Sequence, residues 1–140
     1  MDCVFCAIVA GGAAAHRVLD DGVAVAFLDT KPLFPGHTLV VPRRHVATLT
    51  DLAADDVGPF FRRVRQVAAG VERGMAAEGT FVAENNRVSQ SVPHLHVHVV
   101  PRLRKDRLRG FFWPRGRYAD DAEAAAVARR LRNAISSVEA

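Results

Sequence analysis

His94-Leu95-His96-Val97-His98-Val99-Val100-Pro101 is the stretch of this sequence that decides the fold, because histidine alternates in it with apolar residues. Side chains of a β-strand point alternately to its two faces. We therefore expect a strand from Pro93 to Pro101 whose histidines share one face and whose Leu95, Val97 and Val99 face the core. Three of the chain's six histidines lie in this stretch. Packing alone does not explain such a row, so it predicts a functional site.

Two chemistries suit this row of imidazoles. Neutral imidazole is a common metal ligand, and it also attacks an electrophile covalently when a neighbouring group sets its tautomer. Because metal–nitrogen bonds are about 2.0–2.1 Å long, three rings spread along a strand do not meet easily at one ion. Ser91 and Asn85-Asn86 lie upstream and a basic run follows downstream. Polar donors and cations around an imidazole favour attack on phosphorus over attack on a neutral carbonyl.

Working outward, the sequence predicts an α+β fold with a mostly antiparallel sheet, one long helix packed on it and a C-terminal helix. Thr50 or Asp51 is expected to cap the long helix, with Pro59 in or near its first turn, and Gly79 is expected to end the region. Its apolar residues follow the helical period: Val57, Phe60, Phe61, Val64, Val67, Ala68, Val71 and Met75. The other strands are expected at Arg17–Leu19, Val23–Leu28, Thr38–Val41 and Thr80–Ala83, with a hairpin turn at Asp21-Gly22.

Two further helices complete this prediction. The first segment, Cys3–Ala10, reads as a short turn of helix stopped by Gly11-Gly12. The C-terminal helix is expected to be capped by Asp120 or Asp121. Its apolar stripe comprises Ala124, Val127, Ala128, Leu131, Ile135 and Val138.

Composition limits the class of protein. The chain has 140 residues, 49% of them hydrophobic and 24% charged, which predicts one globular domain over residues 1–140. The longest apolar run, Cys3–Ala10, has eight residues, whereas a membrane span takes about 20. No secretory signal is readable, so we expect a cytoplasmic protein without a membrane partner.

The formal net charge is +4, and much of it lies between Arg102 and Arg117. This run is either a solvated loop or a field that attracts phosphate-bearing ligands. No nucleic-acid-binding motif accompanies it, so nucleic acid is not expected as a partner.

The run from His94 to Val100 resembles the signature of the histidine triad family, in which three histidines alternate with apolar residues. Phe27-Leu28-Asp29, the segment from Pro35 to Pro42 and Arg44-His45 are similar to the family as well. The resemblance covers roughly residues 3 to 102. It implies an α+β fold and a homodimer whose two sheets join.

The resemblance implies a nucleotide site with a role for each matching residue. His96 is the expected nucleophile, which attacks the α-phosphorus and forms a nucleotidyl-histidine that water then hydrolyses. The expected phosphate-binding or supporting residues are His98, Ser91, Gln90, Asn86, Asn85 and His37. The expected ribose- and base-binding residues are Asp29, Phe5, Ile8 and Phe27, and we expect a purine base. In each case a packing or turn role is the alternative.

One segment departs from the family pattern. Asn85-Asn86-Arg87-Val88-Ser89-Gln90 is shorter than the usual loop before the triad, and Ser89 stands where glycine is usual. Glycine there allows a close approach of backbone to ligand. We therefore expect this phosphate loop to be built differently. Downstream, the aromatic segment 110–114 is expected either to shape the leaving-group side or to form a surface anchor.

Cys3 and Cys6 form a C-x-x-C pair. A thioredoxin-like pair follows a strand, and position 3 leaves no room for one, so chance burial and metal binding remain. Some members of the histidine triad family bind structural zinc with such a pair and two histidines. That resemblance implies zinc ligation by Cys3, Cys6, His45 and His94, which leaves His96 and His98 for chemistry.

The function that follows is hydrolysis at the α-phosphate of nucleoside phosphoramidates, dinucleoside polyphosphates or related nucleotides. The alternatives are a nucleotidyl transferase, a nucleotide-binding regulatory module with little turnover, and a zinc-dependent hydrolase that uses the histidine row directly. The leaving group is not readable from the sequence.

Overall fold

The computed structural model describes residues 2–109 and 115–138. The chain divides into two compact units, residues 1–106 and 107–140. The aromatic segment 110–114 lies outside the described residues. The elements of the first unit are α1 (Val4–Val9), β1 (Arg17–Asp20), β2 (Ala24–Leu28), β3 (Thr38–Pro42), the 3₁₀ turn η1 (Leu49–Asp51), α2 (Ala54–Gly74), β4 (Gly79–Ala83) and β5 (Val97–Arg102).

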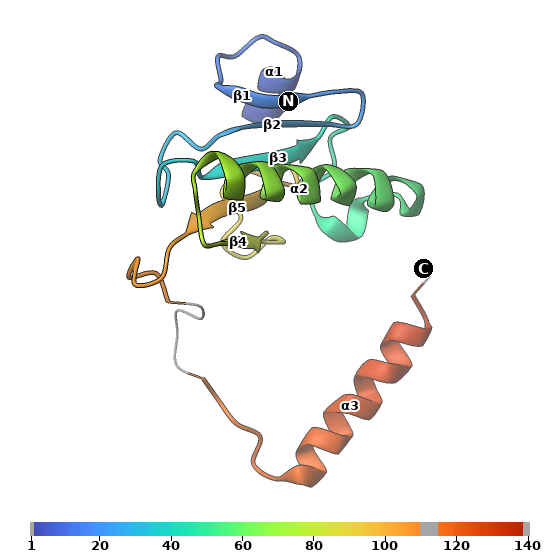
Figure 1. Ribbon diagram of the computed structural model, residues 1–140. Helices are drawn as coiled ribbons and strands as arrows, with labels where there is room; N and C mark the ends of the chain where they lie inside the picture. Colours follow the sequence, from blue (N-terminus) through green and yellow to red (C-terminus); the bar gives the residue numbers. More distant parts are fainter. Residues whose placement is uncertain (1, 110–114, 139–140) are drawn as a thin grey trace. The chain divides into compact units, whose positions relative to one another are not determined.

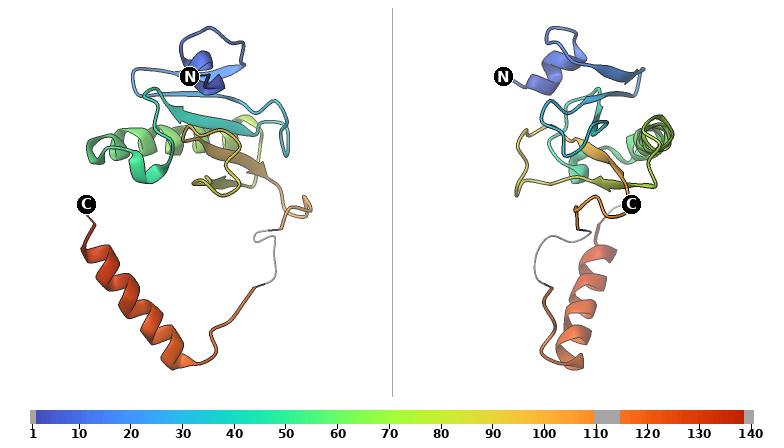
Figure 2. Two further views of the ribbon diagram at one scale, coloured as in Figure 1. Left: turned by 180° about the vertical axis from the view of Figure 1, so that it is seen from behind. Right: turned by 60° about the vertical axis from the view of Figure 1, so that its left-hand side comes forward.

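The five strands form one sheet in the order β1-β2-β3-β5-β4. All four neighbouring pairs are antiparallel, which confirms the expected α+β architecture. Figures 1 and 2 show α2 lying along one face of this sheet, with α1 beside β1 and β2. The hairpin between β1 and β2 turns at Asp21, whose Oδ1 accepts hydrogen bonds from the backbone N–H groups of Val23 and Ala24.

The central strands β2 and β3 are buried on both faces, because helices cover both sides of the sheet there. Ala24 and Ala26 of β2 belong to the core under α2, whereas Val25 and Phe27 belong to a second core under α1. This alternation is the period of two that a strand imposes on its side chains. The α1 face of the sheet is the one that carries the site.

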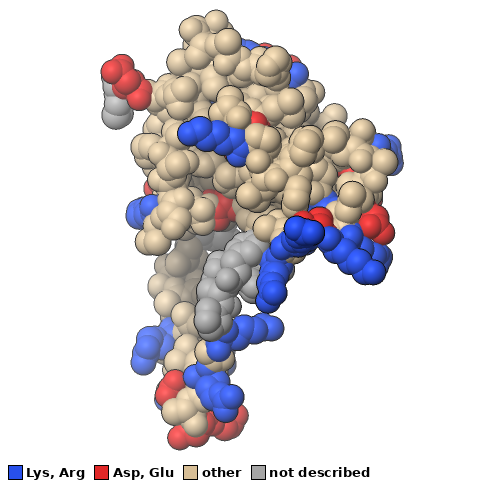
Figure 3. All heavy atoms as spheres, turned by 90° about the vertical axis from the view of Figure 1, so that its left-hand side faces the viewer, with Lys and Arg blue, Asp and Glu red and all other residues tan. Residues whose placement is uncertain are grey.

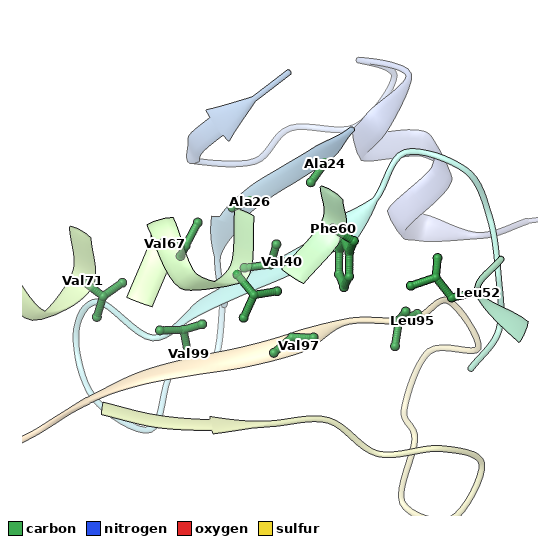
Figure 4. Packing of buried hydrophobic residues seen from close by; sticks show 11 residues of the cluster. Ala24, Ala26, Val40, Leu52, Phe60, Val67, Val71, Leu95, Val97 and Val99 are labelled. Atoms are coloured by element: carbon green, nitrogen blue, oxygen red, sulfur yellow. The ribbon is translucent and has the colours of Figure 1, made fainter. Parts of the chain in front are cut away.

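The core under α2 is built from residues of α2 that recur every three to four positions: Phe60, Val64, Val67 and Val71. Figure 4 shows α2 residues above Val40 of β3 and Val97 and Val99 of β5. Phe60 and Val99 are among its most completely buried side chains. Val57 and Met75, placed at the two ends of the expected stripe, are exposed instead.

The ends of α2 differ from the prediction. Asp51 accepts hydrogen bonds from the N–H and the hydroxyl of Thr48, so this pair closes the separate turn η1. The helix therefore begins later, at Ala54, and Pro59 lies near its first turn, at the sixth position of the helix. The helix ends at Gly74, and Gly79 begins β4 rather than ending the helical region.

The histidine strand is shorter than predicted. It begins at Val97, opposite Val40 of β3, rather than at Pro93. The N–H of Leu95 instead donates to the carbonyl of Val46. Leu95 nevertheless packs with Val97 in the core under α2, so the predicted alternation of faces continues through the segment before the strand.

The second unit contains α3 (Asp121–Ser136). Asp120 caps it, as predicted, by accepting a hydrogen bond from the N–H of Glu123. The predicted apolar stripe is present in sequence, but no residue of α3 is buried, and Leu131 and Ile135 are exposed. None of the helices in the described ranges combines the length and the apolar character that a membrane span needs.

Candidate active site and metal centre

A cavity of about 340 Å³ opens on the α1 face of the sheet. Antiparallel pairing places Leu39 of β3 between Phe27 of β2 and His98 of β5, so these three residues form one row across the floor. The cavity is lined by Val4, Phe5, Ile8, Ala13, Ala14, Ala15, Phe27, Asp29, Thr30, Leu39, Ser91, Val92, His96 and His98. Nine of these residues are apolar, and five are polar: Asp29, Thr30, Ser91, His96 and His98.

His96 has a defined tautomer. Its Nδ1 atom lies 2.8 Å from the carbonyl oxygen of His94, and a carbonyl oxygen only accepts hydrogen bonds. Nδ1 therefore carries the proton in the neutral ring, and Nε2 has the free lone pair. A buried imidazole with its proton held by the backbone is arranged as a nucleophile.

His98 has the opposite tautomer, which is set through His37. The backbone N–H of Leu33 donates to His37 Nδ1 at 3.0 Å, so the neutral His37 ring carries its proton on Nε2. That Nε2 lies 2.9 Å from His98 Nδ1 and donates to it. His98 therefore keeps its own proton on Nε2, as a hydrogen-bond donor beside the nucleophile.

Burial keeps this histidine pair neutral. Desolvation, followed by the neighbouring His96 and His37, lowers the pKa of His98 to about 4. Desolvation also lowers the pKa of His37, against the opposing effect of the nearby Asp29 carboxylate. Near neutral pH the donor on His98 is thus a neutral imidazole N–H.

Asp29 combines a turn role with a place on the cavity wall. Its Oδ1 accepts a hydrogen bond from the backbone N–H of Lys31, which is the turn role considered for it. Its Oδ2 lies 3.6 Å from His37 Nε2. Asp29 lines the cavity, so its carboxylate is available to a ligand hydroxyl.

The apolar part of the cavity comes from α1 and β2, as expected for Phe5, Ile8 and Phe27. The Phe5 ring contacts Phe27 edge-on at 5.4 Å between centroids and His96 at 5.0 Å. All three apolar residues are also buried in the core under α1, so the packing role and the wall role both hold. The sequence reasoning missed Ala13–Ala15, which carry no pattern beyond their small size.

The loop before the triad uses its amides within the protein. Asn86 accepts from the N–H of Leu49, and Gln90 donates to the carbonyl of Ala47. Asn85 donates to the carbonyl of Ser89. Of the four residues expected to bind phosphate here, Ser91 lines the cavity, whereas Asn85, Asn86 and Gln90 do not.

Ser89, which stands where glycine is usual in the family, has a left-handed backbone conformation. Its φ is +62°, in the left-handed region that glycine adopts without cost and other residues adopt at about 1–2 kcal/mol. Ser89 therefore has a backbone conformation that favours glycine, although it is not glycine.

A second cluster lies beside the cavity. Cys3, Cys6, His45 and His94 bring one potential ligand atom each to within 4.8 Å of the others. His94 Nδ1 lies 3.2 Å from His45 Nδ1 and 3.5 Å from both sulfur atoms. Cys6 Sγ lies 3.2 Å from His45 Nδ1.

These spacings fit a tetrahedral metal ion. Zinc bonds of about 2.3 Å to sulfur and about 2.0–2.1 Å to nitrogen separate tetrahedral ligand atoms by about 3.3–3.8 Å. His94 Nε2 donates to the carbonyl of Pro42 at 3.0 Å, so its Nδ1 has the lone pair that a metal requires. Burial lowers the pKa of His94 and raises that of the Cys6 thiol. A bound cation would favour the thiolate form of Cys6.

Asp29, His37 and His98 also bring three donor atoms together, yet their hydrogen bonds argue against a metal. His37 Nδ1 accepts from Leu33, so the nitrogen that faces the other two groups carries a proton. The proton on His37 already explains the close contact with His98. Among the described residues, the cysteine-containing cluster therefore suits a metal ion, whereas Asp29, His37 and His98 form a cluster in which His37 donates a hydrogen bond to His98.

The basic run after β5 is partly neutralised. Arg102 pairs with Asp106, and Arg104 pairs with Glu78. On the face shown in Figure 3, Lys and Arg side chains gather at separate places, with Asp and Glu beside several of them. This arrangement favours the solvated-loop interpretation of the run.

Comparison with known proteins agrees with the signature. The HIT domain family matches residues 11–105. An uncharacterised HIT-like protein of Mycobacterium tuberculosis is 36% identical over 100% of this chain and 97% of its own length. An adenosine 5'-monophosphoramidase of Schizosaccharomyces pombe is 31% identical over 81% of this chain and 84% of its own.

A solved structure extends the similarity to the fold. The zinc-bound histidine triad family protein of Mycobacterium smegmatis has a TM-score of 0.73 and 35% identity, covering 99% of both chains. With the sequence match, the five-stranded sheet and the histidine row in agreement, the chain is a member of the HIT domain family.

Proposed function

We propose that this protein is a nucleotide hydrolase that cleaves the bond between the α-phosphorus of a nucleotide and its leaving group. One observation carries the proposal: His96 lines the cavity, and because the His94 carbonyl accepts from its Nδ1–H, the neutral ring has its lone pair on Nε2. The apolar and polar parts of that cavity suit a nucleotide, which has a flat base at one end and phosphate at the other.

In the first step His96 Nε2 attacks the α-phosphorus. An Nε2–P bond forms, and the bond from phosphorus to the leaving nitrogen or oxygen breaks with its electron pair on the leaving atom. As the ring becomes positively charged, the His94 carbonyl that accepts the Nδ1–H stabilises that charge. Ser91 lies on the cavity wall and donates to the leaving group or to a phosphate oxygen.

In the second step water attacks the nucleotidyl-histidine. An O–P bond forms as the attacking water gives up a proton to solvent, the Nε2–P bond breaks, and His96 regains its lone pair. His98 donates its Nε2–H to a phosphate oxygen in both steps, and His37 holds that tautomer by donating to His98 Nδ1. Fixed donors aimed at developing negative charge contribute strongly to catalysis.

The remainder of the nucleotide follows the walls of the cavity. The Asp29 carboxylate accepts the ribose hydroxyls, and a purine base lies against Phe5, Ile8 and Phe27. Asn85, Asn86 and Gln90 shape the loop that presents Ser91, since their amides already bond within the protein.

The S. pombe relative, by its name, acts on an adenosine monophosphoramidate, which supports this substrate class. Purified protein should hydrolyse an adenosine phosphoramidate when tested beside a dinucleoside polyphosphate and a nucleotide sugar. His96→Asn should lose this activity, and the matched control is His16→Asn, because His16 is an exposed histidine outside the site. Release of AMP from none of the three substrates would contradict the proposal, and transfer of AMP to added phosphate in place of hydrolysis would identify a transferase.

We further propose that Cys3, Cys6, His45 and His94 bind one structural zinc ion. The ion would supply no chemistry to phosphorus; it would tie the N-terminal segment to the segment before β5. Protein purified without added metal should contain about one zinc per chain. Absence of zinc, with both thiols freely titratable in the native state, would contradict this site.

We also propose a cytoplasmic homodimer in which residues 1–140 act as a single domain. The exposed apolar side chains of α3 support association with a second copy. Two free cysteines arranged as metal ligands suit a reducing compartment. Sedimentation equilibrium should give twice the mass of the chain, and a monomer at micromolar concentration would contradict the dimer.

A further inference from the structure

The helix α1 belongs to both the metal cluster and the nucleotide cavity. Cys3 caps the helix, with its sulfur accepting from the N–H of Cys6, and both sulfurs face His94. Between and after them, Phe5 and Ile8 line the cavity. The two sets of side chains therefore share six residues of backbone.

His94 connects the metal cluster to the nucleophile as well. Its ring joins the cysteines through Nδ1, and its carbonyl holds the Nδ1–H of His96. The Phe5 ring lies 6.0 Å from the His94 ring and 5.0 Å from the His96 ring. A displacement of the sulfurs would therefore affect both the apolar wall at Phe5 and the nucleophile His96.

The sulfurs are accessible to small oxidants. Both cysteines are half-buried rather than enclosed, and His45 beside them is exposed. A surface hollow of about 500 Å³ is lined by Asp2, Cys3, Val4, Cys6 and Ala7. Peroxide therefore has access to the two sulfurs, which lie within 4.8 Å of each other.

We propose that Cys3 and Cys6 form a redox-sensitive latch, in which their oxidation by peroxide releases zinc and frees α1 from the nucleotide cavity. The inference rests on the proposed zinc site and nucleotide site. One thiolate attacks a peroxide oxygen, the O–O bond breaks, and a sulfenic acid and hydroxide form. The second thiolate displaces hydroxide from that sulfur, so two thiolates lose two electrons and peroxide becomes two hydroxides.

The two states exclude each other geometrically. Tetrahedral zinc holds its two sulfurs about 3.8 Å apart, whereas a disulfide joins them at about 2.05 Å. A disulfide also removes both thiolate ligands. Loss of the metal removes the attachment of α1 to His45 and His94. The helix has six residues, and an isolated helix of this length is unstable in water.

The test uses the zinc-loaded full chain treated with hydrogen peroxide. We expect one zinc released per disulfide, a mass lower by two hydrogens, and AMP affinity lower by about tenfold or more, the scale of losing one buried aromatic wall. Chelation of zinc from the reduced chain should weaken AMP binding equally. Thiol reduction with added zinc should restore it.

Three outcomes would overturn the latch. The first is that zinc leaves and the disulfide forms while AMP affinity stays within about twofold. The second is that the cysteines keep their zinc under peroxide. The third concerns Cys6→His, a variant that keeps a metal ligand at position 6 but leaves Cys3 without a disulfide partner. The latch is overturned if peroxide lowers AMP binding in this variant as much as in the original chain. An untreated chain without zinc or without AMP binding would instead overturn the proposed function, and the latch with it.

Discussion

The Nδ1 atom of His96 lies 2.8 Å from the carbonyl oxygen of His94, two residues earlier in the chain. Because this acceptor belongs to the backbone, no side-chain substitution removes it directly. The tautomer of the nucleophile is therefore set by the path of the chain just before β5. That path is held by the Leu95 N–H on Val46 and by the His94 ring on Pro42.

Asp29 should contribute to nucleotide binding but not to phosphate binding. Its carboxylate lines the cavity, and a hydrogen bond to a charged group contributes about 1.5–3 kcal/mol. Asp29→Asn keeps an acceptor for the Lys31 N–H and removes the charge. We expect AMP affinity to fall about tenfold or more and inorganic phosphate affinity to stay unchanged, by calorimetric titration. Equal losses for both ligands would mean that Asp29 serves the fold.

Stability should fall as the pH is lowered, and His98 should contribute to the fall. Its folded pKa is about 4, against 6.5 as the ordinary value. Below pH 6.5 the unfolded chain binds a proton that the folded chain does not, so the stabilisation present above that pH is lost as pH falls toward 4. Urea unfolding at a series of pH values measures this.

The contribution of His98 is isolated by His98→Asn, since zinc release in acid affects both proteins alike. The free energy of unfolding of the variant should depend less steeply on pH between 6.5 and 4 than that of the original chain. Parallel pH profiles would show that His98 is not held neutral by the fold.

The loop before the triad should be stabilised by a glycine. Ser89 has a φ of +62°, so Ser89→Gly removes backbone strain, and we expect about 1 kcal/mol of added stability. Val88 is exposed and has no such backbone, so Val88→Gly should cost about 0.5–1 kcal/mol. Chemical denaturation of both variants decides; a loss of stability in Ser89→Gly would contradict the assignment.

Much of this arrangement could be predicted from the sequence, because alternation and helical periodicity are local patterns. Leu95, Val97 and Val99 pack as their spacing predicts. The extent of the histidine strand could not, since the N–H of Leu95 bonds to the carbonyl of Val46, a partner distant in the sequence. The predicted start of α2 was also wrong, because Asp51 bonds to Thr48 and closes a separate turn.

The site shows the same division. Phe5, Asp29 and His96 meet at one cavity, as the resemblance implied. The amides of Asn86 and Gln90 bond to Leu49 and Ala47, distant partners that no local pattern reveals. The His37–His98 hydrogen bond likewise depends on the register between β3 and β5.

The central claim is that His96 is the covalent nucleophile, and it is tested most directly by trapping the intermediate. Rapid quench with an adenosine phosphoramidate labelled at the α-phosphorus should leave label on the chain at His96, and later exposure to acid should release that label. His96→Asn should bind AMP nearly normally, form no labelled protein and lose at least about a thousandfold in turnover. Normal turnover in that variant, or label on another residue, would contradict the account.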